Sequence, residues 1–125
     1  MSKRLLIVDD EETIRFAVKR YFTRIGFEVD CARELEEAEA LATHTRYGVV
    51  IADLSLTDSG SNEGLEIVRF MRHSCPTARV IVLTAHGSPS IENEAYKRGA
   101  DVFLHKPQRL NDLAEIVDRL TEGHA

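Results

Sequence analysis

The sequence predicts a doubly wound α/β domain, in which a parallel sheet carries helices on both faces. Two observations predict this fold class. Three short segments are continuous apolar runs typical of buried strands. In all, five predicted strands alternate along the chain with five segments of helical periodicity, and this alternation is typical of parallel sheets built from strand–helix–strand units. The length of 125 residues suits one domain. We therefore expect a single domain over residues 1–125, with its core at about residues 4–122.

The predicted strands are short, and the first, third and fourth contain continuous apolar runs, as expected for strands that are buried on both faces of a sheet. The predicted strands lie at residues 5–8, 27–31, 47–52, 80–83 and 102–104. Apolar side chains recur every three or four residues in the predicted helices, at residues 14–25, 35–42, 64–74, 88–98 and 110–120. Gly26, Pro76 and Gly99 follow three of these helices and are typical of helix ends. Residues 54–62 are rich in turn-forming side chains and are expected to form a loop.

Composition excludes several classes of protein. The net charge of −5 argues against non-specific nucleic-acid binding, which needs clustered positive charge. The longest apolar runs have four residues, whereas a transmembrane helix needs about twenty. The first residues do not resemble a signal peptide, and Cys31 and Cys75 are expected to be free thiols. The sequence therefore predicts a cytoplasmic protein without a membrane segment.

Polar side chains follow four of the predicted strands. Asp9 and Asp10 follow the first strand, Asp53 the third, Thr84 the fourth and Lys106 the fifth. In a parallel sheet the carboxyl ends of the strands share one edge, and ligands bind there. Each residue alone could simply cap the next helix. Together, at the ends of four strands, they indicate a functional site.

The charges of this predicted site indicate its chemistry. Two carboxylates about 4 Å apart repel by roughly 4 kcal/mol at an effective dielectric constant near 20, so a proton or a cation is expected between them. Carboxylate oxygens with room for water suit Mg²⁺, and a nearby lysine suggests a phosphate-like substrate. A carboxylate can itself attack phosphorus to give an aspartyl phosphate. Asp53, at the end of the central strand, is best placed to do so.

These motifs resemble those of the response regulator receiver domain of two-component signalling systems, particularly the single-domain chemotaxis type. The resemblance covers about residues 4–122 and implies a flavodoxin-like (βα)5 fold with strand order 2-1-3-4-5. The matching segments are Leu6-Ile7-Val8-Asp9-Asp10, Val50-Ile51-Ala52-Asp53, Val82-Leu83-Thr84-Ala85, Gly99-Ala100-Asp101 and Phe103 through Lys106-Pro107.

The resemblance implies that Asp53 accepts a phosphoryl group from a sensor histidine kinase or a phosphotransfer protein. Mg²⁺ would be held by Asp9, Asp10, Asp53 and the main-chain carbonyl of Ser55. The protein would be a signalling domain rather than an enzyme, since it would catalyse only its own phosphorylation and dephosphorylation. Its partners would also include a downstream effector or a fused output domain, with no direct nucleic-acid or membrane binding.

The resemblance also assigns a switch. Lys106, next to a cis peptide bond with Pro107, and Thr84 would bind the phosphoryl oxygens. Phe103 would turn inward when Thr84 moves, although it could equally be a plain core aromatic residue. The change would reach an output surface formed by the fourth helix, fifth strand and fifth helix. Ser55 and His86 would tune the lifetime of the phosphoryl group. We hypothesise that His86 orders or excludes water, and a solvated loop histidine is the alternative.

The sequence departs from the family pattern in the loop after Asp53. Thr57 replaces the usual proline, the third helix starts three residues late, and Gln108 replaces an apolar residue after Lys106-Pro107.

Other functions fit less well. A flavin carrier needs a phosphate loop where residues 9–12 are all acidic, and an aspartate-dependent phosphatase needs a second aspartate where Ser55 stands. The cysteines and histidines lack the spacing of a zinc site. A receiver-shaped interaction module that is never phosphorylated remains as an alternative.

Overall fold

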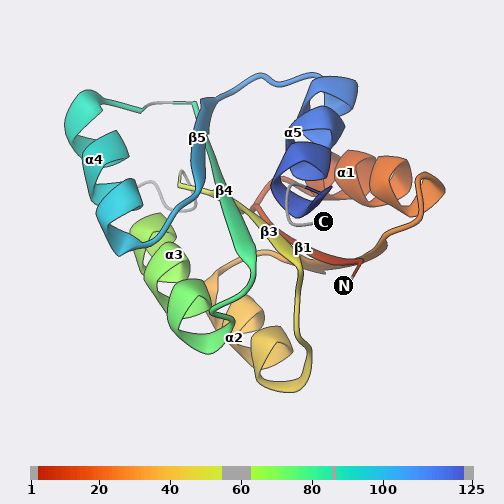
Figure 1. Cartoon of the computed structure of the whole chain (residues 1–125), viewed down its shortest axis with the longest axis horizontal. Helices are drawn as coiled ribbons and strands as arrows, with labels where there is room; N and C mark the ends of the chain where they lie inside the picture. Colours follow the sequence, from red (N-terminus) through yellow and green to blue (C-terminus); the bar gives the residue numbers. More distant parts are fainter. Residues whose placement is uncertain (1–2, 55–62, 86, 123–125) are drawn as a thin grey trace.

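The computed structural model describes residues 3–54, 63–85 and 87–122, and within them five strands alternate with five helices (Figure 1). The strands are β1 (Arg4–Val8), β2 (Glu28–Ala32), β3 (Val49–Asp53), β4 (Arg79–Thr84) and β5 (Val102–His105). They form one sheet in the order β2-β1-β3-β4-β5, and every neighbouring pair is parallel. The predicted doubly wound, flavodoxin-like fold is therefore confirmed.

The helices cover both faces of the sheet. They are α1 (Glu12–Arg24), α2 (Leu35–His44), α3 (Glu63–Ser74), α4 (Pro89–Arg98) and α5 (Leu110–Glu122). Helices α1 and α5 lie on one face, and α2, α3 and α4 lie on the other (Figure 1). Within the described ranges, every helix is too short or too polar to cross a bilayer.

Two core layers form because successive strand residues point to opposite faces. Leu6 and Val50 lie in the layer toward α2–α4, whereas Leu5 and Val49 lie in the layer toward α1 and α5. All four side chains are fully buried, and burying one such side chain contributes about 1.5–3 kcal/mol. Because both faces are covered, the inner strands β1, β3 and β4 read as continuous apolar runs rather than alternating ones.

The boundaries of all five strands differ from the prediction by one or two residues, and the starts of two strands show why. The second strand was expected to begin at Phe27, but the Phe27 N–H donates to the Phe22 carbonyl at 2.9 Å and so completes the end of α1. The third strand was expected to begin at Tyr47, whose buried ring lies in the turn before β3. In both places an aromatic side chain packs in the core without belonging to the sheet, partly buried for Phe27 and buried for Tyr47, so its apolar character was misleading.

The predicted helix ends and turns are largely confirmed. Gly26 and Gly99 follow α1 and α4 with φ of +105° and +118°, the left-handed region that favours glycine. The Ser88 hydroxyl accepts a hydrogen bond from the Ile91 N–H at 3.3 Å and caps α4. The Lys106–Pro107 peptide bond is cis, as the resemblance implied. Most of the predicted loop, residues 55–62, lies outside the described residues.

Candidate functional site

Three carboxylates meet at the carboxyl edge of the sheet, and we call Asp9, Asp10 and Asp53 the acidic cluster. One oxygen of each lies within 4.8 Å of the others. Asp9 follows β1 and Asp53 ends β3, and the two strands are neighbours in the sheet. Asp9 and Asp53 are 0% and 2% exposed, whereas Asp10 is exposed. The acidic cluster is thus buried on one side and open to solvent on the other.

Lys106 brings positive charge to the acidic cluster from the far side of β4. Its Nζ lies 3.0 Å from Asp9 Oδ2, 3.2 Å from Asp53 Oδ2 and 3.7 Å from Glu11 Oε1. Burial acts to lower the pKa of Lys106, but the hydrogen bond to Asp9 and the charges of Asp53 and Asp9 outweigh it and raise the pKa. Lys106 is therefore held protonated, with its donors aimed at the two buried carboxylates.

The Asp9 side chain is fixed by contacts that the sequence analysis did not predict. The Glu11 N–H donates to Asp9 Oδ1 at 2.9 Å, and Arg15 Nη1 donates to the Asp9 carbonyl at 2.8 Å. With Oδ1 held by the main chain, Oδ2 faces Lys106. Two features of the sequence could have indicated these contacts. Glu11 extends the acidic run that begins at Asp9, and Arg15 lies one helical turn after Glu11.

Thr84 ends β4 at the same edge of the sheet. It is 2% exposed and pairs in register with His105 of β5. Its carbonyl accepts a hydrogen bond from the Lys106 N–H at 2.8 Å, so Thr84 and Lys106 are linked through the main chain. The structure thus groups the side chains of Asp9, Asp10, Asp53 and Lys106, and it places Thr84 at the same edge through its main-chain bond to Lys106.

Phe103 lies on β5, and its side chain is part of the core. Its ring is 7% exposed and belongs to the core on the α2–α4 face. The ring meets that of His105 edge-on, with 5.6 Å between centroids. The Phe103 N–H donates to the Tyr96 hydroxyl of α4 at 3.2 Å. Ser55 and His86 lie outside the described residues, and their roles stay predictions.

The acidic cluster suits a divalent cation. Its three negative charges face one close ammonium group, that of Lys106, and Glu11 adds a further negative charge. Carboxylate oxygens with an open, solvated side are the ligands that hard cations such as Mg²⁺ and Ca²⁺ take. The residues present therefore fit a divalent cation, which would compensate the excess negative charge.

A doubly wound sheet with an acidic cluster and a lysine at its carboxyl edge defines the class of protein. The family model for the response regulator receiver domain matches residues 5–118. The chain belongs to this family, as the sequence motifs indicated.

Similar proteins include bacterial regulators longer than this chain. The photosynthetic apparatus regulatory protein RegA of Rhodobacter capsulatus is 31% identical over 99% of this chain and 65% of its own length. The transcriptional regulatory protein SrrA of Staphylococcus aureus is 36% identical over 86% of this chain and 43% of its own length. The chain thus spans about two thirds of RegA and less than half of SrrA.

Solved structures share the fold along nearly the whole chain. A CheY-like receiver domain from Methanospirillum hungatei has a TM-score of 0.89 at 29% identity, covering 99% of this chain and 98% of the other. A response regulator from Burkholderia pseudomallei, solved with a phosphorylated aspartic acid, a calcium ion and citrate, has a TM-score of 0.86 at 29% identity. That match covers 98% of this chain and 71% of the other.

Proposed function

We propose that Asp53 accepts a phosphoryl group from the phosphohistidine of a sensor histidine kinase or a phosphotransfer protein, with Mg²⁺ bound beside it. One observation carries this proposal. Asp53 is buried at the end of the central strand, 3.2 Å from Lys106 and within 4.8 Å of the other two carboxylates. A nucleophile, a cation site and a fixed ammonium are therefore side by side, as phosphoryl transfer requires.

The transfer exchanges one bond to phosphorus for another. An Asp53 oxygen attacks the phosphorus, the bond from phosphorus to the donor imidazole nitrogen breaks, and that nitrogen keeps the electron pair. Mg²⁺ would supply charge compensation for the phosphoryl oxygens, held by Asp9, Asp10, Asp53 and the Ser55 carbonyl. Lys106 would leave its present hydrogen bonds to the carboxylates and donate to a phosphoryl oxygen instead.

Thr84 and Phe103 would report the phosphoryl group to a partner. The Thr84 hydroxyl would donate a hydrogen bond to a phosphoryl oxygen. Phe103 lies on β5, which pairs with the strand that Thr84 ends, β4. Charge-assisted bonds to Lys106 and Thr84 supply a differential interaction between the two states. Inverting a 1:99 equilibrium takes about 5.5 kcal/mol, so these bonds would provide part of the bias.

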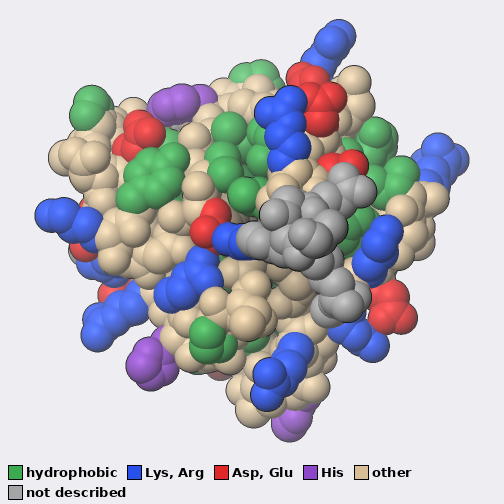
Figure 2. Space-filling model, in the orientation of Figure 1, with side chains coloured by type: hydrophobic (Ala, Val, Ile, Leu, Met, Phe, Trp, Pro, Cys, Tyr) green, Lys and Arg blue, Asp and Glu red, His purple; other side chains and the backbone are tan. Residues whose placement is uncertain are grey.

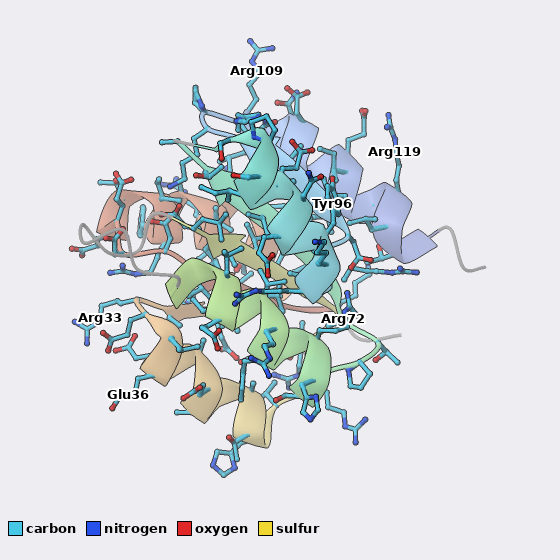
Figure 3. All side chains as sticks on the ribbon, turned by 90° about the vertical axis from the view of Figure 1, so that its left-hand side faces the viewer. Arg33, Glu36, Arg72, Tyr96, Arg109 and Arg119 are labelled. Atoms are coloured by element: carbon cyan, nitrogen blue, oxygen red, sulfur yellow. The ribbon has the colours of Figure 1, made fainter. Side chains whose placement is uncertain are left out.

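The output surface would be formed by α4, β5 and α5. Figure 2 shows hydrophobic side chains gathered on this face, framed by side chains of both charges. Tyr96 of α4 is 44% exposed (Figure 3). Aromatic residues within a polar rim suit a protein partner, so a downstream effector or a fused output domain would bind here. The net charge of −5 does not favour direct binding of nucleic acid by this domain.

Residues 4–122 would form the receiver domain, with no reaction on any separate substrate beyond its own phosphorylation and dephosphorylation. Cys31 and Cys75 are free thiols, which is typical of proteins in the reducing cytoplasm. Ser55 and His86 would tune the phosphoryl lifetime. An unchanged dephosphorylation rate and pH profile in His86→Ala would contradict the assignment of His86.

The experiment is incubation with acetyl phosphate and Mg²⁺, followed by intact mass measurement. We expect one added phosphoryl group on the wild-type protein and none on Asp53→Asn. Asp112→Asn, an exposed carboxylate on α5, is the matched control and should be modified like the wild type. No adduct on the wild type, or an adduct that survives Asp53→Asn, would show that the domain is an interaction module or is modified elsewhere.

A further inference from the structure

The loop between β4 and α4 packs against the end of the sheet at Gly87, which no motif had singled out. A Cβ atom placed on Gly87 would lie 2.9 Å from Phe103 Cε1, 2.9 Å from Thr84 Cγ2 and 3.0 Å from His105 Cε1. Side-chain carbons essentially never approach other atoms more closely than 3.0 Å. A side chain at residue 87 would therefore require at least one of these three side-chain ends to shift.

The backbone does not require a glycine at this position. Among the described residues the glycines with positive φ are Gly26 and Gly99, so Gly87 has a conformation that other residues adopt. The requirement at Gly87 comes from the space around it and not from its dihedral angles. This separation makes the contact testable by one added methyl group.

The three atoms around Gly87 join the phosphoryl site to the aromatic ring. Thr84 pairs with His105 in the sheet, and Phe103 lies two residues before His105, so all three side chains point to the same face. The His105 ring covers the edge of Phe103 from the solvent side. A side chain at residue 87 would thus meet the Thr84 methyl and both rings at once.

We propose that Gly87 is the positioning residue for Phe103: it admits the ring to its buried site, and a side chain there would displace ring and loop together. Residue 87 therefore sets the balance between the inward and outward positions of the ring. Because Thr84 borders the same space, this balance would be linked to phosphoryl binding. That linkage rests on the proposed function, whereas the steric claim does not.

The first experiment tests the steric claim without any phosphoryl group. In the wild-type protein we expect nuclear Overhauser contacts between the Phe103 ring and the Thr84 γ-methyl. Gly87→Ala should weaken or remove these contacts. The matched control is Gly26→Ala, which strains a left-handed backbone where no atom lies within 4 Å of the added methyl. It should lower the melting temperature and keep the contacts.

The second experiment measures the linkage to the site. Overpacking a tight contact disfavours the crowded state, so Gly87→Ala should bind Mg²⁺–beryllofluoride about tenfold more weakly than the wild type. Gly26→Ala should bind like the wild type. Full ring contacts and wild-type affinity in folded Gly87→Ala would overturn the proposal. Failure of the wild type to bind beryllofluoride would instead reject the proposed function and leave the ring contacts to decide the steric claim.

A double variant covers the case in which Gly87→Ala does not fold. Phe103→Ala removes the ring that the added methyl would strike, so the pair of substitutions should be less harmful together than their separate effects predict. Gly87→Ala/Phe103→Ala should then fold where Gly87→Ala does not, with any remaining loss relative to Phe103→Ala coming from the contacts of the added methyl with Thr84 Cγ2 and His105 Cε1. A double variant as unfolded as Gly87→Ala would place the clash elsewhere and contradict the role given to Phe103.

Discussion

The carboxyl and amino edges of the sheet differ in how their charged side chains are paired. At the carboxyl edge, the acidic cluster places three carboxylates around one lysine. At the amino edge, Arg72 of α3 and Arg79 of β4 flank Asp101, which accepts hydrogen bonds from Arg72 Nη2 and from the Val80 N–H, both at 2.8 Å. We call these three residues the arginine–aspartate cluster.

The arginine–aspartate cluster links several helix and strand ends by hydrogen bonds. Arg72 also donates to the main-chain carbonyls of Gly99, Pro76 and Ala78 at 2.7–3.1 Å, and so ties the ends of α3 and α4 to the start of β4 (Figure 3). Its donors are used within the fold. The acidic cluster, in contrast, keeps an excess of like charge. The difference indicates that the amino edge supports stability and the carboxyl edge supports binding.

The largest expected effect comes from removing the divalent cation that is proposed to bind at the carboxyl edge. Compensation of phosphoryl charge by a metal ion contributes several kcal/mol to such reactions, and each 1.36 kcal/mol is a factor of ten in rate. Chelation with EDTA should therefore slow phosphorylation by acetyl phosphate by at least about 1000-fold. The rate is measured by intact mass against time. A rate that is insensitive to EDTA would remove the cation from the proposed mechanism.

The next largest effect lies at the amino edge. Arg72→Ala removes hydrogen bonds to three carbonyls and to Asp101, and should lower the free energy of unfolding by about 2–4 kcal/mol. Urea denaturation measures it, with Arg69→Ala, an exposed arginine on the same helix, as the control. The folded variant should still accept one phosphoryl group from acetyl phosphate. Loss of phosphorylation in folded protein would show that the two edges are not independent.

The sequence predicted the carboxyl edge much better than the amino edge. Asp53 ends β3 and Lys106 follows β5, with only β4 between these two strands. The geometry of a parallel sheet alone brings such strand ends together. Arg72 reads as an ordinary charge in the last turn of a helix, because three of its four partners are main-chain carbonyls and two partners, Gly99 and Asp101, lie far along the chain. The role of Gly87 was equally hidden, since it depends on the rotamers of Phe103 and His105.

A smaller effect with the opposite sign is expected within the acidic cluster. Asp53→Asn keeps the shape of the side chain but removes one of three like charges, so without divalent cations it should raise the free energy of unfolding by about 1 kcal/mol. Added Mg²⁺ should stabilise the wild type more than the variant, because binding to the folded state stabilises it. Urea curves in EDTA and in Mg²⁺ test both points. A less stable variant in EDTA would mean that the pairing of Asp53 with Lys106 outweighs the repulsion.

The smallest effect concerns Tyr47, which precedes β3 at the amino edge and donates its hydroxyl to Asp30 Oδ2 at 2.6 Å. Burial, the hydrogen bond to Asp30 and the charge of Asp30 raise the pKa of Tyr47. A raised pKa of the folded state gives stability that is complete below the ordinary tyrosine pKa of about 10. That stability is lost as the pH rises from there through the raised value.

Tyr47→Phe should therefore cost about 0.5–1 kcal/mol at neutral pH and should lose stability less steeply than the wild type above pH ~10. Urea denaturation at several pH values measures both quantities. Tyr21→Phe is the control for the loss of a tyrosine hydroxyl, since Tyr21 packs edge-on against Phe22 in the opposite core layer. If Tyr47→Phe keeps the wild-type slope, the hydrogen bond between Tyr47 and Asp30 does not stabilise the fold, and the amino edge depends on the arginine–aspartate cluster alone.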